Sequence, residues 1–194
     1  MKRKLLSIFI SFFAILFLSS CIGGEEISTD DDSTIGKYNY ETANFSIHIP
    51  PDWEIIENNK FTSSVPDDIV VVFRNNIKNE IFTANASVGV NILSAPLTSS
   101  DLGKSTLAKA RTRLIDYREI KNEQRNVNYG EESLLGYYAM YEGKRSADSP
   151  ITVFKQLFAV RGEIGYIVTA AYLPTEDETV VNYIDDLLES FSLK

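Results

Sequence analysis

The sequence predicts an α+β fold, because patterns typical of strands recur along most of the chain and two amphipathic segments are typical of helices. Phe45–Ile49 alternates apolar and polar residues, which is the pattern of a strand with one buried face. Residues 69–73 form a short continuous apolar run that suits a strand covered on both faces. Residues 86–93 alternate again, so at least three strands precede the first predicted helix.

The first predicted helix begins around Thr98-Ser99-Ser100, whose hydroxyls suit an N-cap, and Asp101 falls in its first turn. Five residues recur at spacings of four, three, four and three and share one face: Gly103, Leu107, Ala110, Leu114 and Tyr117. Several of these residues are small, so we expect the helix to approach a sheet closely.

The C-terminal part predicts more strands and a second helix. Segments 134–142, 151–161 and 164–173 read as strands, and Arg161-Gly162-Glu163 predicts a turn that pairs the last two as an antiparallel hairpin. Residues 175–178 read Thr-Glu-Asp-Glu, which matches a capping box. The helix that follows carries one apolar face, which should pack on the sheet: Val180, Val181, Ile184, Leu187, Leu188 and Phe191.

The N-terminus predicts an exported, anchored protein. Residues 2–4 are basic and residues 5–18 are apolar except for two serines, a run shorter than the about 20 residues of a membrane span. Leu18-Ser19-Ser20-Cys21 resembles the lipobox of secreted lipoproteins, which implies that the Cys21 thiol receives a diacylglyceryl group and that cleavage occurs just before it. The alternative is a simple signal peptide, or an uncleaved anchor, with an incidental cysteine.

The predicted organisation is a lipoprotein signal peptide at residues 1–20, a lipidated, acidic and flexible tether at 21–37, and a single domain at 38–194. The whole chain carries a formal charge of −8. Removing residues 1–20 removes three basic and no acidic residues, so 16 Lys and Arg face 27 Asp and Glu, a net charge of −11. Such a chain should not bind nucleic acid or anionic headgroups through bulk charge.

Several motifs of the domain together resemble the PsbP family of extrinsic photosynthetic proteins and their relatives. They are Phe45-Ser46-Ile47 leading through Pro50 to Trp53, Gly165-Tyr166 followed by Val168-Thr169, and a terminal helix that ends in Ser190-Phe191. The resemblance covers residues 38–194. It implies an α/β/α sandwich with a central antiparallel sheet covered by helices on both faces, and a protein that binds, docks or helps to assemble membrane complexes. It supplies no shared catalytic residues, and nothing in the sequence matches a photosystem-docking segment.

The residues themselves predict no enzyme, metal or cofactor site. His48 is the single histidine and lies within a predicted strand, and Cys21 is the single cysteine, so a histidine- or cysteine-based metal centre has no ligands. No Gly-x-Ser-x-Gly motif is present. Adjacent acidic pairs, at Asp67-Asp68, Glu131-Glu132 and Asp185-Asp186, point in different directions and are typical of a soluble surface.

Tyr137, Tyr138 and Tyr141 cluster on one predicted strand and are the candidate partner surface. The alternative places them at the border of the core, with their hydroxyls in water. The sequence therefore predicts a non-catalytic binding or assembly module, lipid-anchored at the extracytoplasmic face of a membrane and docked on a membrane or envelope protein complex. Two alternatives remain: a surface lipoprotein that binds a small molecule, and a cell-surface hydrolase with convergent carboxylates.

Overall fold

A computed structural model of the chain describes residues 38–61, 65–77 and 79–194. The predicted lipidation residue Cys21, the predicted signal peptide and the predicted tether lie outside these residues.

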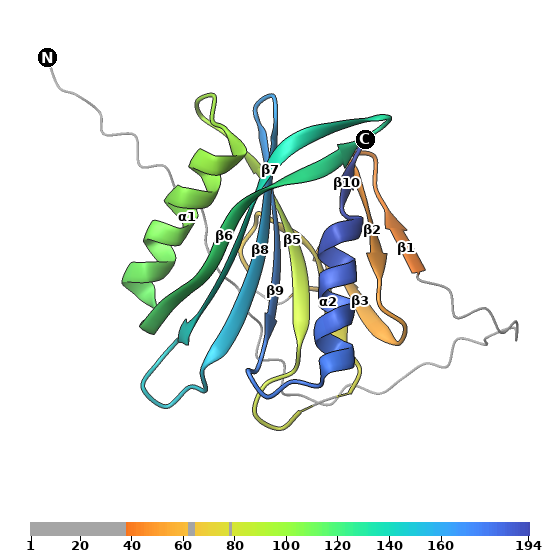
Figure 1. The fold of residues 1–194 in the computed structure, drawn as a ribbon. Coiled ribbons are helices and arrows are strands. Elements are labelled where there is room, and N and C mark those ends of the chain that lie inside the picture. Colours follow the sequence, from red (N-terminus) through yellow and green to blue (C-terminus); the bar gives the residue numbers. More distant parts are fainter. Residues whose placement is uncertain (1–37, 62–64, 78) are drawn as a thin grey trace, which may run out of the picture.

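The described strands form one ten-stranded sheet in the order β1-β2-β10-β6-β7-β8-β9-β5-β4-β3. All neighbours pair antiparallel except β10 and β6, which run parallel. The sheet curls into a half-barrel (Figure 1). The bounds are β1 Tyr38–Glu41, β2 Phe45–Ile49, β3 Trp53–Glu57, β4 Ile69–Asn75, β5 Asn85–Ile92, β6 Ile115–Tyr129, β7 Glu132–Lys144, β8 Thr152–Arg161, β9 Ile164–Tyr172 and β10 Ser192–Leu193.

Two α-helices, α1 (Ser99–Arg113) and α2 (Glu178–Ser190), and one short 3₁₀ helix, η1 (Asn58–Lys60), complete the described residues. The expected sandwich, with helices covering both faces of a central antiparallel sheet, is therefore wrong: 51% of the described residues are in strands and 20% are in helices. The physical reason is the curl. The largest apolar cluster draws side chains from strands across the whole sheet, and α2 adds only Val180, Ile184, Leu187 and Leu188 to it. Much of the concave face is thus covered by the sheet itself rather than by a layer of helices.

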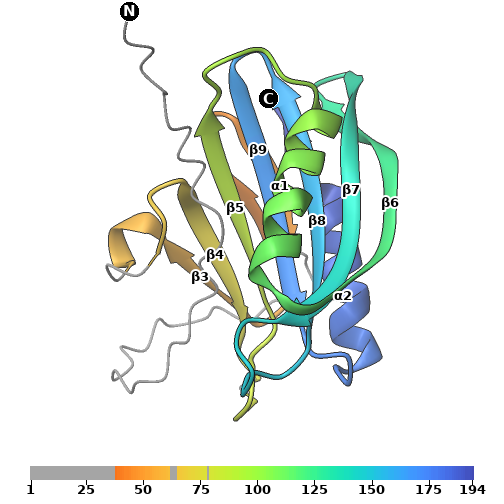
Figure 2. The same ribbon diagram turned by 90° about the vertical axis from the view of Figure 1, so that its left-hand side faces the viewer.

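The helix α1 packs on the outer face of the sheet, over β7 and β8 (Figure 2). Of the three hydroxyls that could cap it, the structure uses that of Thr98: it accepts from the Asp101 amide at 3.1 Å, and the Asp101 carboxylate completes a capping box. The predicted stripe is confirmed for three buried residues, Gly103, Leu107 and Ala110. Leu114 and Tyr117 are partly buried against the same cluster but lie outside the helix, because Leu114 is the C-cap and β6 begins at Ile115.

The second predicted capping box is wrong. The helix α2 begins at Glu178, and its N-cap is Asp177, whose carboxylate accepts from the Thr179 amide at 2.8 Å. Its apolar face is as expected, with Ile184 fully buried. The predicted hairpin is confirmed: β8 and β9 pair antiparallel, and Gly162 in the turn has a φ of 60°.

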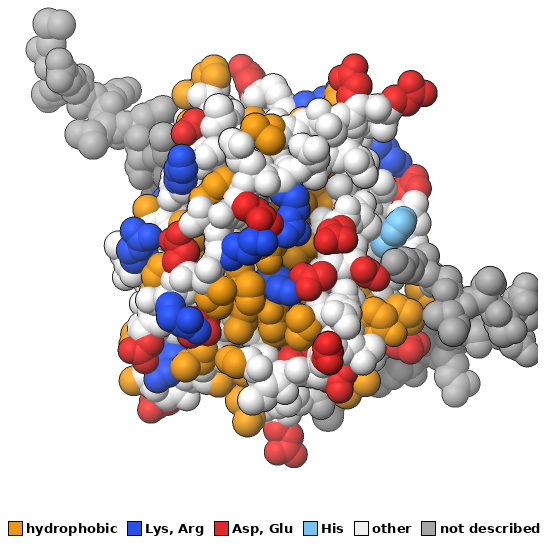
Figure 3. Space-filling model, viewed as in Figure 1, with side chains coloured by type: hydrophobic (Ala, Val, Ile, Leu, Met, Phe, Trp, Pro, Cys, Tyr) orange, Lys and Arg blue, Asp and Glu red, His pale blue; other side chains and the backbone are white. Residues whose placement is uncertain are grey.

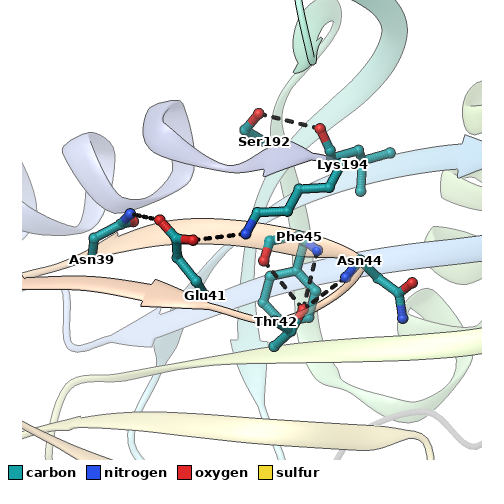
Figure 4. A network of polar contacts seen from close by, with 8 residues as sticks. Asn39, Glu41, Thr42, Asn44, Phe45, Ser192 and Lys194 are labelled. Atoms are coloured by element: carbon teal, nitrogen blue, oxygen red, sulfur yellow. Dashed lines mark hydrogen bonds and ion pairs between the residues drawn. The ribbon is translucent and has the colours of Figure 1, made fainter.

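The last residues hold two parts of the sheet together. Ser192 of β10 lies between Ser46 of β2 and Asn128 of β6. The Lys194 amide donates to the Asn44 carbonyl at 3.0 Å, and the Lys194 ammonium lies 2.7 Å from the Glu41 carboxylate (Figure 4). A strand of two residues thus links the β1–β2 hairpin to the rest of the sheet.

Most of β6 has a strand neighbour on one side only. It pairs with β7 along its length, whereas β10 reaches only Asn128 and Tyr129, and the described residues supply no other strand beside it. The strand carries bulges, between Ile115 and Arg118 and between Glu119 and Lys121. Bulges and charged side chains are the means by which proteins prevent such an edge from pairing with another chain.

Candidate functional site

The three predicted partner-surface tyrosines are buried. Tyr137, Tyr138 and Tyr141 have exposed fractions of 6%, 3% and 0%. Tyr137 and Tyr141 belong to the cluster beneath α1, and Tyr138 belongs to the cluster on the concave face. The prediction of a tyrosine partner surface is therefore wrong, because β7 has neighbours on both sides and a packed cluster on each face.

The predicted acidic pairs are not brought together into a cleft. Within the described residues, no group of three or more His, Cys, Asp and Glu side chains is arranged to hold a metal ion. His48 is exposed on β2, as expected for the polar face of a strand, and its backbone amide donates to the Ser190 hydroxyl of α2 at 2.8 Å. It borders a pocket of about 100 Å³ between β2 and α2, whose wall is mainly apolar: Ile49, Pro50, Pro51, Tyr183, Asp186 and Leu187.

The most unusual group in the described structure is a buried cation on the concave face. The side chain of Lys155, in β8, is only 6% exposed. Its ammonium donates to the Asp185 carboxylate of α2 at 2.6 Å and lies 5.4 Å from the centroid of the Tyr172 ring. Alternation along β8 places Lys155 beside Val153 and Leu157, so a charged group stands in an otherwise apolar row.

A second layer of charges lies next to this pair, on the long hairpin of β6 and β7. The Arg125 guanidinium stacks 3.9 Å from the centroid of the Tyr138 ring. Glu123 lies 2.8 Å from both Arg125 and Lys121. These hydrogen bonds, with Lys121 first and Arg125 second, lower the pKa of the Glu123 carboxyl below its ordinary value. In Figure 3, basic and acidic side chains gather on this face around an apolar surface.

The tyrosines of this site are held in the protonated state. Burial, followed by the charge of Asp185, raises the pKa of Tyr172 to about 12. The same two causes, in the same order, raise the pKa of Tyr138 well above its ordinary value. At neutral pH, both hydroxyls can donate hydrogen bonds but cannot act as bases. The site can therefore orient or bind a group, and it supplies no activated nucleophile.

The opposite face of β8 carries a neutral polar network. The Tyr141 hydroxyl donates to the Gln156 side-chain carbonyl at 3.1 Å, and the Gln156 amide donates to the Thr169 hydroxyl at 2.9 Å. Gln156 is 1% exposed, so these bonds satisfy groups that would otherwise be costly to bury. This network positions β7, β8 and β9 relative to one another; it is buried at Tyr141 and Gln156 and partly buried at Thr169.

Alternation along the predicted strand 151–161 could have located both polar groups. Lys155 and Gln156 interrupt a strand whose other central residues are apolar, and a polar residue in a doubly covered strand requires a partner. The partners themselves could not be found, because Asp185 lies 30 residues away from Lys155 on another element.

No protein-family model and no curated protein matches the sequence. Solved structures do match the fold. The cyanobacterial PsbP of Synechocystis sp. PCC 6803, CyanoP, superposes with a TM-score of 0.60 at 18% identity, over 91% of this chain and 99% of that chain. The chain has the PsbP fold. The resemblance inferred from the sequence motifs is therefore confirmed at the level of fold.

Two further structures share this fold more distantly. LpqN of Mycobacterium tuberculosis, described as involved in cell envelope biogenesis, has a TM-score of 0.55 at 10% identity, over 77% of this chain and 83% of that chain. The protein PA94 of Pseudomonas aeruginosa, of unknown function, has a TM-score of 0.50 at 13% identity, over 79% and 94% of the two chains. None of the three descriptions names an enzyme.

The motifs that carry the PsbP resemblance meet in the core. Phe45, Trp53, Tyr166, Val168 and Phe191 all belong to the concave apolar cluster. The Phe191 ring lies 5.7 Å from Phe45 and 6.2 Å from Tyr166, measured between centroids. These residues specify how the PsbP fold packs, and they leave its surface unspecified.

Proposed function

We propose that this protein is a lipid-anchored extracytoplasmic module that binds a protein partner at the cell envelope and assists the docking or assembly of a membrane complex, without catalysis of its own. The observation that carries the proposal is the PsbP fold, which matches CyanoP over 99% of that chain. The likeness to LpqN, described as involved in cell envelope biogenesis, supports the same compartment.

The N-terminus supports the anchor. In the described residues, no helix is long and apolar enough to cross a bilayer. A diacylglyceryl group on Cys21 would supply two acyl chains, and each buried CH₂ contributes about 0.8 kcal/mol, so two chains hold where one dissociates. The net charge of −11 after cleavage supports a protein partner over nucleic acid.

The site geometry supports binding over catalysis. The Lys155–Asp185 pair is internally satisfied, and the neighbouring tyrosines are protonated. The pocket beside His48, at about 100 Å³, is smaller than the 300–1,000 Å³ typical of small-molecule sites. The satisfied ion pair and the protonated tyrosines favour binding over hydrolysis, and the small volume of the pocket beside His48 disfavours a small ligand at that position.

The test is lysine cross-linking in cells of the tagged full-length protein, followed by mass spectrometry of the membrane fraction. We expect one dominant partner, with cross-links confined to one face. Lys104 reports on the α1 face and Lys121 on the concave face, because both are exposed. The matched control replaces residues 1–21 with a cleavable secretory signal that leaves no cysteine: the protein should leave the membrane fraction and lose the partner. An unchanged set of background proteins in both forms would refute the proposal.

A further inference from the structure

The first described residue, Tyr38, and several connecting loops lie at the same end of the sheet. Tyr38, the first residue of β1, pairs with Ile49, the last residue of β2. The pairing of neighbouring strands shows which end of every other strand lies at this same end of the sheet. The residue pairs found there are Trp53 with Asn75, Arg74 with Asn85, Asn85 with Ala171, Val153 with Tyr172, and Gly143 with Thr152. The β2–β3, β4–β5 and β7–β8 connections therefore leave the sheet at the same end, at the bottom of Figure 1. We call it the loop end.

Large apolar side chains are exposed at the loop end. Ile77 and Ile81, both in the β4–β5 connection, are 77% and 61% exposed. Tyr38 is 68% exposed, and Ile151, just before β8, is 37% exposed. Exposed apolar residues also occur at the opposite end, where Ile92 is 89% exposed, so what distinguishes the loop end is that it also bears Tyr38, where the chain from Cys21 enters the domain.

Asparagine side chains hold the backbone at each of the two isoleucines, on either side of residue 78, which lies outside the described residues. The Ile77 amide donates to the Asn75 side-chain oxygen at 3.0 Å, and the Ile81 amide donates to the Asn79 side-chain oxygen at 2.8 Å. Phe82, the next residue, is buried in the cluster beneath α1. One large apolar residue of this connection thus anchors it to the domain, while two others face solvent.

We propose that the loop end lies against the bilayer that carries the lipid anchor, with Ile77 and Ile81 entering the membrane interface; this rests on the proposed acylation of Cys21. Sixteen residues separate Cys21 from Tyr38. A flexible segment of that length has a mean reach of about 20–25 Å. A domain of this size is about 40 Å across, so the end that bears Tyr38 is the one held nearest the lipid.

The charged residues of the loop end indicate which lipid headgroups it can contact. Its three connections contain the acidic residues Asp52, Glu80 and Asp148 and the basic residues Lys78 and Arg145, a net charge of −1. Because this charge gives no attraction to anionic headgroups, the proposed contact is apolar in origin and suits zwitterionic lipid. Isoleucine side chains at the level of the headgroups gain from apolar burial without any need for basic residues.

The test measures the depth of one introduced tryptophan in the acylated protein on phosphatidylcholine vesicles with brominated acyl chains. Ile77→Trp is compared with Ile92→Trp, a matched control, because Ile92 is 89% exposed at the opposite end of the sheet, beside the β8–β9 turn. Both sites are exposed, so neither change should disturb the fold, and near-ultraviolet circular dichroism checks this. The unmodified protein gives the background from Trp53, which is buried.

We expect the emission of Ile77→Trp to shift to shorter wavelength and to lose intensity in brominated vesicles, and that of Ile92→Trp to change in neither respect. Ile81→Trp should behave as Ile77→Trp does. Equal quenching at positions 77 and 92, or quenching at neither in protein that floats with the vesicles, would overturn the proposed orientation and leave the anchor intact. Acylated protein that does not float with vesicles would overturn the anchor, and the orientation with it.

Discussion

Replacement of Gly103 by alanine should destabilise the protein, although alanine is the better helix former. A Cβ added at Gly103 would lie 2.3 Å and 2.9 Å from two carbons of the Tyr137 ring, and 3.1 Å from a carbon of Phe158. The ring would have to retreat by about 1 Å to reach ordinary contact. Tyr137 is 6% exposed and packs against Phe158, with centroids 6.2 Å apart, so it has little room to move.

The magnitude follows from two opposing effects. Overpacking a filled core costs about 1–3 kcal/mol, and an overlap this large belongs at the upper end of that range. Alanine in place of glycine within a helix stabilises the helix by about 1 kcal/mol. The expected net loss in the free energy of unfolding is about 2 kcal/mol, and at about 2–4 °C for each kcal/mol the melting temperature should fall by about 4–8 °C.

Urea denaturation followed by circular dichroism measures this change. Lys104→Ala is the control in the same helix, because Lys104 is exposed and should shift the midpoint very little. Tyr137→Leu removes the obstructing ring, so Gly103→Ala should no longer destabilise in that background. A Gly103→Ala protein that is as stable as its parent, or more stable, would refute the close approach of α1 to β7.

Three further results are expected. Asp177→Ala should cost about 1 kcal/mol of stability through loss of the α2 cap, whereas Thr175→Ala should cost almost nothing, as urea midpoints would show. Burial raises the pKa of the Asp68 carboxyl above its value in the unfolded chain. Ionisation of Asp68 therefore destabilises the folded state: the full cost applies above the folded pKa, and none of it remains below the unfolded pKa. Asp68→Asn should therefore stabilise at pH 7, by an amount that shrinks as the pH falls through that window; a gain independent of pH would contradict this. Asp185→Ala leaves the buried Lys155 cation without its half-exposed partner and should cost about 1–3 kcal/mol, and Lys155→Met should recover much of that loss in the same chain. A double variant no more stable than Asp185→Ala alone would contradict the ion pair.

Local sequence patterns predicted the elements whose causes are themselves local. The hairpin turn around Gly162 and the cap at Thr98 depend on neighbouring residues, and the structure has both. The capping-box pattern at Thr175 failed, because Asp177 offers a competing carboxylate two residues later. The same kind of pattern therefore gave one correct and one incorrect helix start.

The features that the sequence did not predict depend on distant parts of the chain. The strand β10 has two residues, too few for any periodicity, and it exists because β2 and β6 flank it. The sandwich was wrong because curl is a property of the whole sheet, and long strands such as β6 and β7 cover the core themselves. The tyrosine surface was wrong because alternation gives two faces but does not tell which of them is solvated; on β7 neither is.

The residues that carry the PsbP resemblance lie in the core, so they do not indicate which part of the surface is functional. The PsbP motifs are core residues, so selection for packing alone can preserve them while the surface changes, and at 18% identity the surface of CyanoP is no guide to this one. Replacing the buried tyrosines would lower the stability of the domain, and the resulting loss of folded protein could be misread as a loss of binding. Side chains that are exposed and held in place, such as Ile77 and Lys121, are the ones whose replacement can separate docking from folding.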